Sequence, residues 1–335
     1  MANLPLSVLD QSPIPSGATA AQALADSTRL AQITEALGYR RYWVAEHHGS
    51  ESFAGCAPEI LIAHIAAATQ RIRVGSGGVM LMHYSPYKVA ETFKLLQTLH
   101  PGRIDLAIGR APGSDGLTAA ALAYGNQLGV EYFPAKVADL RAFLHGQPPM
   151  TEALTRVKAT PRVERPPDLW MLGSSEEGGR IAAHFGLPFA YAHFINPDHV
   201  ERACQVYRDN FRPTPEQPAP HVMLGVFVLC ADTDAEAEDL AACRDLWRLR
   251  VERGEFGPFP SVAEATAHPY SDAERARIAE RRKHQILGTR HPVAKQLRAL
   301  AETVGADELS VVSITHEFER RVRCYELLAE AFDTG

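Results

Sequence analysis

Polar, titratable or very small residues stand where several apolar stretches of this sequence end. Glu46, His47 and His48 follow directly on Tyr42-Trp43-Val44-Ala45. Comparable positions after other apolar stretches hold Asp10, Gln11, Gly77, Gly78, Arg110, Gly173, Ser174, Ser175, His193, Asp232 and His316. If the stretches are parallel strands of a barrel, their carboxyl ends meet on one face and these residues form a polar rim around one mouth. The rim is the strongest indication of chemistry that the residues themselves give.

The pair His47 and His48 admits three interpretations. A histidine at such a rim could serve as a general acid or base near neutral pH. Together with Glu46, the pair could instead ligate zinc or iron. Successive side chains of a strand point to opposite faces, however, so the two imidazoles cannot reach one ion without a bend in the chain. A hydrogen bond to a neighbouring strand is the third, purely structural interpretation.

Arg110 and the segment Gly173-Ser174-Ser175 form a candidate anion site. A guanidinium can clamp a phosphate with two hydrogen bonds, or it can form an ordinary salt bridge at the rim. The serines precede a predicted helix that begins near Glu176. They could cap that helix, or the helix N-terminus could bind a phosphate. Glu176 and Glu177 oppose the second interpretation unless they face away.

Gly77 and Gly78 end a third apolar stretch with backbone that carries no side chain. Such backbone lets a flat ligand approach closely, but a tight turn or a bulge would use the same residues. Residues 109–116 do not form a phosphate loop, because the Gly-Lys-Ser/Thr ending is missing.

Short apolar stretches alternate with segments of helical periodicity along the chain. Eight stretches are predicted as strands: residues 4–9, 39–46, 72–81, 103–109, 169–173, 189–195, 222–231 and 309–314. Strands separated by helices pair in parallel, and eight of them predict a closed (β/α)₈ TIM barrel of the α/β class. A doubly wound open sheet is the alternative. It would need a glycine-rich phosphate turn after the first strand, and residues 10–13 are not one.

Two long connections account for the length of 335 residues, which exceeds that of a bare barrel. They follow the fourth and seventh strands, at about residues 111–168 and 232–308. The first is predicted to be mostly helical over 115–144, with a break around Gly125 to Gly129. The second contains a charged stretch, Ala273 to His284, which is either a solvated helix with a flexible lead-in or part of a lid over the mouth. We expect residues 1–335 to form a single barrel domain with 232–308 as its insertion or lid region.

Composition excludes several classes of protein. The formal net charge is −6, so no strongly basic surface for nucleic acid is indicated. No run of about 18 apolar residues predicts a membrane span, and the first twenty residues lack the pattern of a secretory signal. Five cysteines at wide spacings indicate reduced thiols rather than a disulfide framework or a zinc ribbon. We expect a cytoplasmic protein that acts on a small molecule.

Several of these segments together resemble the bacterial luciferase-like monooxygenase family, in its single-chain, non-luminescent form. The resemblance rests on Tyr42 to His48, Val74 to Leu81, Gly102 to Arg110 and Gly186-Leu187-Pro188. It covers most of the chain from Leu4 to about Asn196, and the last strand and helix more weakly. It implies a TIM barrel that binds FMN, frequently as a homodimer. Family members take reduced FMN from a separate NAD(P)H:flavin reductase and use it with O2 to oxidise an organic substrate.

Residue roles follow from the resemblance position by position. His47 matches the family's catalytic histidine, and Glu46 lies beside the flavin. Gly77 and Gly78 match a non-proline cis peptide against the flavin ring, and Arg110 matches the arginine that binds the flavin phosphate. The remaining cofactor positions are Gly173, Ser174, Ser175 and His193.

Two positions depart from the family pattern, and three other functions stay open. Gly109 stands where the luciferase pattern has a cysteine, and His193 where it has an aromatic residue. An enzyme of the same barrel family could use the deazaflavin F420 for hydride transfer without oxygen. A flavin-binding protein without turnover is another possibility. A metal-dependent barrel hydrolase is disfavoured, because no His-X-His pair ends the first strand and no metal site is predicted.

Overall fold

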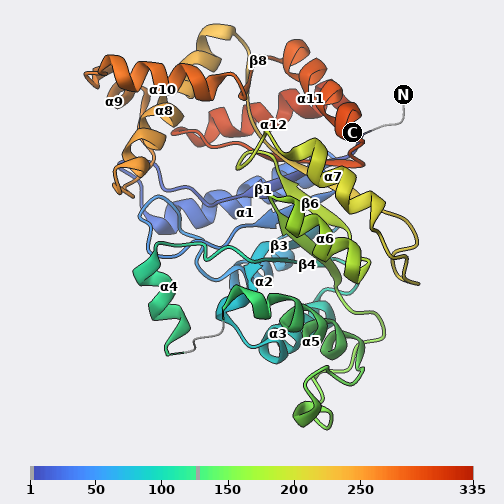
Figure 1. Cartoon of the computed structure of the whole chain (residues 1–335). Helices are drawn as coiled ribbons and strands as arrows, with labels where there is room; N and C mark the ends of the chain where they lie inside the picture. The colour runs from blue at the N-terminus through green and yellow to red at the C-terminus, as the bar shows by residue number, and fades with distance from the viewer. Residues whose placement is uncertain (1–3, 126–128, 335) are drawn as a thin grey trace.

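Eight parallel strands close into a barrel in the order β1-β2-β3-β4-β5-β6-β7-β9, and β9 pairs with β1 (Figure 1). The structure is a computed structural model, and it describes residues 4–125 and 129–334. The barrel strands are β1 (Leu6–Asp10), β2 (Arg41–Val44), β3 (Arg73–Met80), β4 (Ile104–Gly109), β5 (Asp168–Gly173), β6 (Phe189–Ala192), β7 (Val222–Ala231) and β9 (Glu308–Val312). The predicted (β/α)₈ barrel is confirmed, and the open sheet is wrong.

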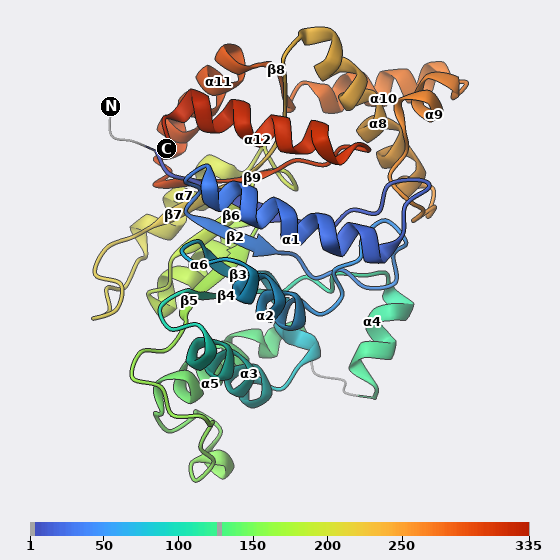
Figure 2. The ribbon, with the colours of Figure 1, turned by 180° about the vertical axis from the view of Figure 1, so that it is seen from behind.

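Helices surround the barrel on its outside (Figure 2). The α-helices are α1 (Ala20–Ala36), α2 (Pro58–Ala68), α3 (Pro86–Leu99), α4 (Gly116–Ala123), α5 (Phe133–His145), α6 (Glu176–Phe185), α7 (Val200–Asp209), α8 (Asp234–Glu252), α9 (Val262–Ala267), α10 (Asp272–Arg282), α11 (Arg290–Val304) and α12 (Phe318–Phe332). Short 3₁₀ turns are η1 (Leu81–His83), η2 (Val130–Tyr132) and η3 (Glu152–Leu154). No helix among these is long and apolar enough to cross a bilayer.

Strand side chains alternate between two apolar clusters, as the two-residue period of a strand requires. Trp43, Ala107 and Trp170 belong to the cluster inside the barrel. Tyr42 and Leu106, their neighbours along the strands, belong to the outer cluster with the buried faces of the helices. Both faces of each strand are therefore buried, which explains why the strands are continuously apolar in the sequence.

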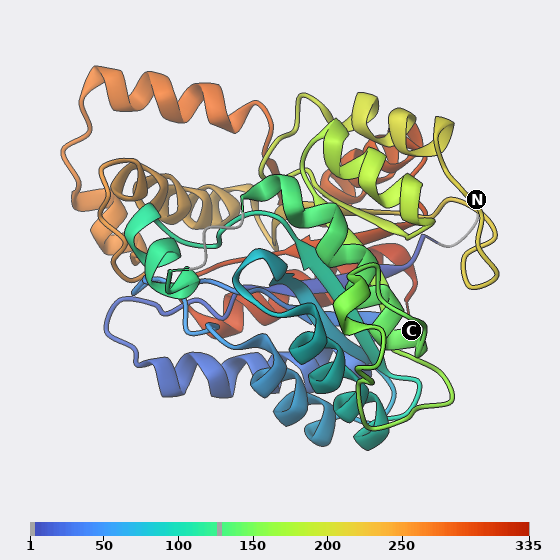
Figure 3. The ribbon, with the colours of Figure 1, turned by 60° about the horizontal axis from the view of Figure 1, so that its bottom comes forward.

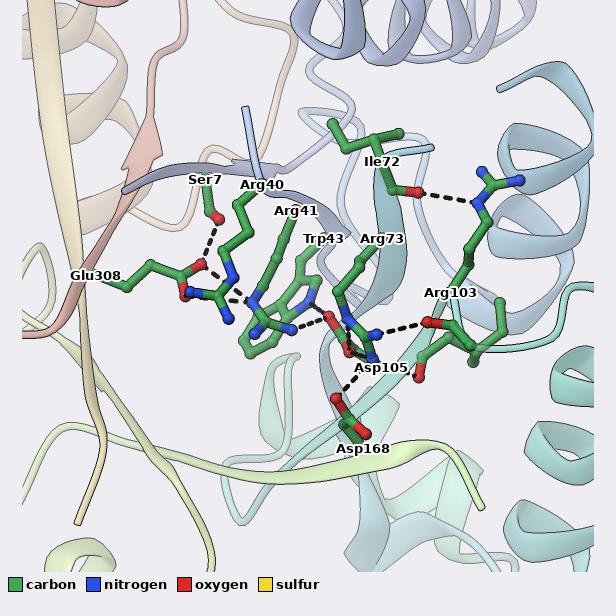
Figure 4. A network of polar contacts seen from close by, with 12 residues as sticks. Ser7, Arg40, Arg41, Trp43, Ile72, Arg73, Arg103, Asp105, Asp168 and Glu308 are labelled. Carbon is green, nitrogen blue, oxygen red and sulfur yellow. Dashed lines mark hydrogen bonds and ion pairs between the residues drawn. The ribbon is translucent and has the colours of Figure 1, made fainter. Parts of the chain in front are cut away.

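The amino-terminal ends of the strands hold a buried polar network (Figure 4). Asp105 accepts hydrogen bonds from Arg41 Nη1 at 2.7 Å, Trp43 Nε1 at 2.9 Å and Arg73 Nε at 2.9 Å. Glu308 pairs with Arg41 Nε at 3.0 Å and accepts a short bond from Ser7. This network joins β1, β2, β3, β4 and β9 at the end opposite the rim. Residues at that end of a TIM barrel usually stabilise the fold, whereas catalytic residues lie at the rim.

The second insertion contains a strand that the sequence analysis did not predict. β8 (Ile286–Thr289) pairs in parallel with the last residues of β7, from Val228↔Ile286 to Ala231↔Thr289. β7 is ten residues long and runs past the barrel, so its extension is free to pair. The eighth predicted strand, 309–314, corresponds to β9.

Other expected boundaries shift by a few residues. β6 ends at Ala192 rather than Ile195, because the chain turns and Ile195 N donates to Ala192 O at 3.1 Å. The predicted helical segment 115–144 divides into α4, η2 and α5. The expected break falls between α4 and η2, and its residues 126–128 lie outside the described residues.

The charged stretch 273–284 is largely helical. Ser271 and Glu274 form a reciprocal capping box at the start of α10. The lead-in before α9 is hydrogen-bonded to other segments of the chain. Phe259 N donates to Ile14 O, Ser16 N donates to Phe259 O and Glu51 N donates to Phe256 O. These bonds join the insertion to the loops that follow β1 and β2.

Candidate active site

The carboxyl ends of the strands open toward the end of the barrel where α4 and the insertion helices α8 to α10 gather. Figure 3 shows these helices at one end, and the two chain termini lie toward the other. Strand β2 ends at Val44 and leads directly into Glu46, His47 and His48. The loop after β4 comes up against this segment, because His48 N donates to Gly113 O at 3.0 Å. The structure thus brings the rim positions of β2 and β4 together.

His47 is held by stacking rather than by a side-chain hydrogen bond. Its ring stacks on Phe53 with centroids 4.5 Å apart, and its backbone N donates to Gly55 O. Nδ1 is buried and has no partner among the described atoms. Burial, with a smaller effect of His48, lowers the pKa of His47 to about 4. His47 is therefore a neutral imidazole at pH 7, able to accept or pass a proton without carrying a charge at rest.

The low pKa of His47 makes acid stability a test of its placement. An unfolded histidine titrates near 6.5, so the unfolded state binds the proton first as the pH falls, and the folded state loses stability from about pH 6.5 to about 4. We expect His47→Gln to make the unfolding free energy fall less steeply with pH in this range. The slope should decrease by up to about 1.4 kcal/mol per pH unit, which corresponds to one bound proton. Urea unfolding at several pH values measures the slope. His64→Gln on the exposed face of α2 is the control, and an unchanged slope in His47→Gln would contradict the placement.

Glu46 organises the segments around it. Its carboxylate, 1% exposed, accepts hydrogen bonds from Met80 N at 2.9 Å and Tyr84 Oη at 2.7 Å. It also contacts His48 Nε2 at 2.7 Å. The carboxylate therefore fixes the end of β3 and the following turn against β2. His48 faces this carboxylate while His47 faces Phe53, so the two imidazoles point in different directions, although both residues lie beyond the end of β2.

Gly77 and Gly78 lie within β3, before its last residues Val79 and Met80, and the peptide bond between them is cis. A side chain at Gly77 would place its Cβ 2.5 Å from Leu9 Cδ1, inside the barrel. A Cβ at Gly78 would lie 2.7 Å from the carbonyl oxygen of Ala107 on β4. Close packing of the neighbouring strands is therefore sufficient to require glycine at both positions.

Arg110 and the start of α6 meet, as a shared anion site requires. Arg110 Nη1 lies 2.6 Å from Glu177 Oε2, so Glu177 does not face away but pairs with the guanidinium. Ser175 caps α6 by accepting from Gly178 N, and Ser174 O accepts from Asn196 Nδ2 at 3.0 Å. Gly173 packs against Gly178. The guanidinium and the helix N-terminus thus lie together, but Glu177 occupies the guanidinium, so a phosphate held by both would have to displace this carboxylate.

His193 follows β6 and lies near the second insertion. Its backbone N donates to Tyr191 O, and burial together with the nearby His284 lowers the pKa of its imidazole. The position thus adds a polar, uncharged ring to the mouth rather than an aromatic hydrocarbon.

Three other rim residues have structural partners. Asp10 is buried and pairs with Arg321 Nη2 at 2.5 Å, Asp232 pairs with Arg323, and His316 Nε2 contacts Ser16. Within residues 4–125 and 129–334, no group of three histidine, cysteine or acidic side chains is placed to hold a metal ion. The five cysteines are all unpaired.

Similarity to known proteins extends over nearly the whole chain. The family model for luciferase-like monooxygenases matches residues 4–308. The chain belongs to the luciferase-like monooxygenase family. Among its relatives, a luciferase-like monooxygenase of Escherichia coli K12 is 35% identical over 321 residues, 96% of this chain and 95% of the relative. The N-acetyl-S-alkylcysteine monooxygenase of Bacillus subtilis is 37% identical over 327 residues, 97% of each chain.

Several solved structures have the same fold as this chain. The crystal structure of apo-MsnO8 is 42% identical, covers 99% of each chain and superposes with a TM-score of 0.91. Two more distant structures show the fold alone and differ in cofactor. One is the oxygenating constituent of 3,6-diketocamphane monooxygenase of Pseudomonas putida in complex with FMN, at 17% identity, 98% and 97% coverage and a TM-score of 0.71. The other is an F420-dependent secondary alcohol dehydrogenase, at 13% identity, 98% and 99% coverage and a TM-score of 0.69.

The mouth of the barrel also contains residues that the sequence analysis missed. Phe53 supports His47, and Trp247 of α8 donates from Nε1 to Ser52 Oγ at 3.0 Å and packs edge-on against Phe53. Tyr84 holds Glu46, and Phe227 of β7 packs on the interior cluster. None of these lies directly at the end of a predicted strand, since Phe227 stands in the middle of the stretch 222–231, so the rule that found the rim could not find them.

Proposed function

We propose that this protein is the oxygenase of a two-component system, which uses reduced FMN and O2 to oxidise a small organic substrate. The observation that supports it best is the shared rim. It places Arg110 and the start of α6 on the same mouth as the neutral imidazole of His47. Bound FMN would supply the redox chemistry with oxygen. A separate NAD(P)H:flavin reductase would supply its reduced form, and we expect a cytoplasmic homodimer.

The chain's own residues have separate tasks in this proposal. Arg110 and the N-terminus of α6 hold the cofactor phosphate, with Ser174 and Ser175 shaping the turn. Gly77 and Gly78 present bare backbone to the flavin ring. His47 accepts or donates a proton at an imidazole nitrogen, and Glu46 holds the ends of β2 and β3 in place beside it.

The insertion excludes water from this site. Trp247 and Phe259 pack with centroids 6.1 Å apart, and Phe259 is buried in the interior cluster. The segment around Phe259 is hydrogen-bonded to the loops after β1 and β2. We propose that residues 232–308 act as the cover of the site, with the segment between α8 and β8 moving when substrate enters.

An anaerobic titration with reduced FMN, followed by rapid mixing with oxygen, tests the function. N-acetyl-S-benzylcysteine is the first substrate to add, because the Bacillus subtilis relative is named for N-acetyl-S-alkylcysteines. Tight binding and oxygen-dependent oxidation of an organic substrate would support the proposal. No binding of FMN, with binding of F420, would replace it by hydride transfer. Binding without any oxidation would favour flavin storage.

The phosphate assignment makes a separate prediction. Arg110→Ala removes a charge-assisted contact, so FMN should bind about 10- to 100-fold more weakly, while riboflavin, which has no phosphate, changes by less than about twofold. Glu177→Gln should leave FMN binding unchanged or tighten it, because it frees the guanidinium. Fluorescence titration measures both constants. Arg180→Ala, a neighbour on α6 whose side chain is 60% exposed, is the control. Equal losses for FMN and riboflavin would rule out the assignment.

A further inference from the structure

Helix α8 carries two arginines that no carboxylate of the described chain neutralises. Arg250 and Arg253, near the end of the same helix, pair with Glu264 and Glu274. Arg244 and Arg248 have no hydrogen bond and no acidic oxygen within 4.0 Å among residues 4–125 and 129–334. The contact that the structure gives Arg244 is the ring of Phe227, with the guanidinium carbon 3.8 Å from its centroid.

These arginines are on the face of α8 that covers the barrel mouth. Residues 244, 247 and 248 share one helical face, because positions three and four apart are neighbours. Trp247, between the two arginines, packs on Phe53 with centroids 5.6 Å apart, and Phe53 stacks on His47. Phe227, under Arg244, packs on the interior cluster of the barrel. A continuous set of contacts thus joins Arg244 to the imidazole.

The charges around Arg244 do not supply a counter-ion. Asp245, its neighbour in the chain, is bound by Arg282 Nε at 2.7 Å and by Gln285. Arg281 also lies nearby and pairs with Glu252. Burial and the proximity of Arg248 lower the pKa of Arg244 to about 10, so the group is still a cation at neutral pH. Arg244 is half-buried and Arg248 is exposed, so water reaches both groups, and an anion that joined them would offset the repulsion between the two cations.

We propose that Arg244, assisted by Arg248, binds an anionic group of the organic substrate, such as a carboxylate or sulfonate. The rings of Phe53, Phe227 and Trp247 would cover the apolar part of the same molecule and direct it toward His47. This inference rests on the proposed function, because it takes the barrel mouth as the place of substrate oxidation. Arg110, at the end of β4, lies three strands away around the barrel from β7, so the cofactor phosphate and the substrate anion have separate arginines.

A pair of isosteric probes tests the proposal. The full chain, with and without saturating FMN, is titrated calorimetrically with 3-phenylpropionate and with its neutral amide, 3-phenylpropionamide. We expect wild type to bind the acid at least about tenfold more tightly than the amide. Arg244→Gln should reduce this preference to within about twofold, and Arg248→Gln should reduce it partly. The matched control is Arg298→Gln on α11, another arginine that lies over a phenylalanine, Phe332, but outside the barrel. It should keep the full preference.

Each other outcome overturns the inference. Equal binding of acid and amide by wild type, or no binding of either at about 10 mM, would remove the anion site. The same holds if Arg244→Gln keeps the preference. If Arg244→Gln weakens FMN but not riboflavin, the anion is the cofactor phosphate. A melting temperature of Arg244→Gln far below that of wild type would make Arg244 a structural residue. Failure of wild type to bind FMN would instead contradict the proposed function, whatever the probes do.

Discussion

Replacing His47 by alanine should lower the rate of substrate oxidation by at least about a hundredfold, the usual contribution of a positioned acid or base. FMN binding should change by less than about threefold, because the phosphate site is on β4 and α6 rather than on β2. The imidazole is neutral and its Nδ1 has no hydrogen-bond partner within residues 4–125 and 129–334, so it is ready to exchange a proton with a ligand. Product formation from N-acetyl-S-benzylcysteine with supplied reduced FMN measures the rate, and fluorescence titration measures cofactor binding.

Two further variants separate a chemical role of His47 from a structural one. His64→Ala removes an exposed histidine of α2 and should leave turnover unchanged. Phe53→Leu removes the ring that stacks on His47 and should lower turnover less than His47→Ala does, because the imidazole remains. Turnover of His47→Ala close to that of wild type would show that His47 takes no part in proton transfer. A parallel loss of FMN binding would show that the residue is needed to form the pocket.

The largest effect on stability should come from Asp105, far from the rim. Asp105→Ala leaves Trp43 Nε1 without its partner inside the barrel, and Arg41 and Arg73 each lose one of their two carboxylates. Breaking a buried ion pair from one side typically costs about 3–5 kcal/mol of unfolding free energy. Urea unfolding followed by circular dichroism measures the loss. Asp105→Asn keeps the shape and some of the hydrogen bonds, so it should lose less.

A surface pair provides the control for this prediction. Glu280→Gln removes a carboxylate that pairs with Lys283, where both side chains are more than 60% exposed. Such a pair contributes at most about 1 kcal/mol. If Asp105→Ala loses no more than Glu280→Gln, the network is not a determinant of stability.

The stability that Glu308 contributes to the same network should depend on pH. Burial raises its pKa, but its partners His221, Arg41 and Ser7 outweigh burial and hold it at about 2, so its contribution should be lost as the pH falls from about 4.5 toward 2.

The strands of the barrel could be predicted because each of them is buried on both faces. Such strands are short, continuously apolar stretches bounded by prolines, glycines or acidic residues, and all eight were recognised. β8 was missed, because Ile286–Thr289 has four residues and follows the charged helix α10. Its pairing depends on the extra length of β7, which only the closed barrel defines. The carboxyl end of β6 was predicted too late. The chain turns after Ala192, but Phe194 and Ile195 continue the apolar pattern of the strand.

The candidate site was predictable as a set of positions but not as a set of contacts. The barrel rule places His47, Arg110 and Ser174 on one rim, and the structure brings the guanidinium of Arg110 to the start of α6. The sequence raised the question of where Glu177 points, and the answer, that it pairs with Arg110, depends on the path of residues 111–175. Arg244 and Trp247 were not recognised, because they lie on a helix of the insertion rather than at the end of a strand.

The sequence by itself determined the period of each element and therefore the barrel, its polar rim and its family. Local periodicity and the ends of strands depend on neighbours in the chain, so they can be read without knowing the fold. The tertiary structure alone decided which charges meet. The ion pairs Arg41–Asp105, Arg110–Glu177 and Arg41–Glu308 join residues 64, 67 and 267 positions apart. It also left the half-buried Arg244 without a carboxylate partner among the described residues, because the partners available to a charge are set by the packing of distant segments and not by its neighbours in the chain.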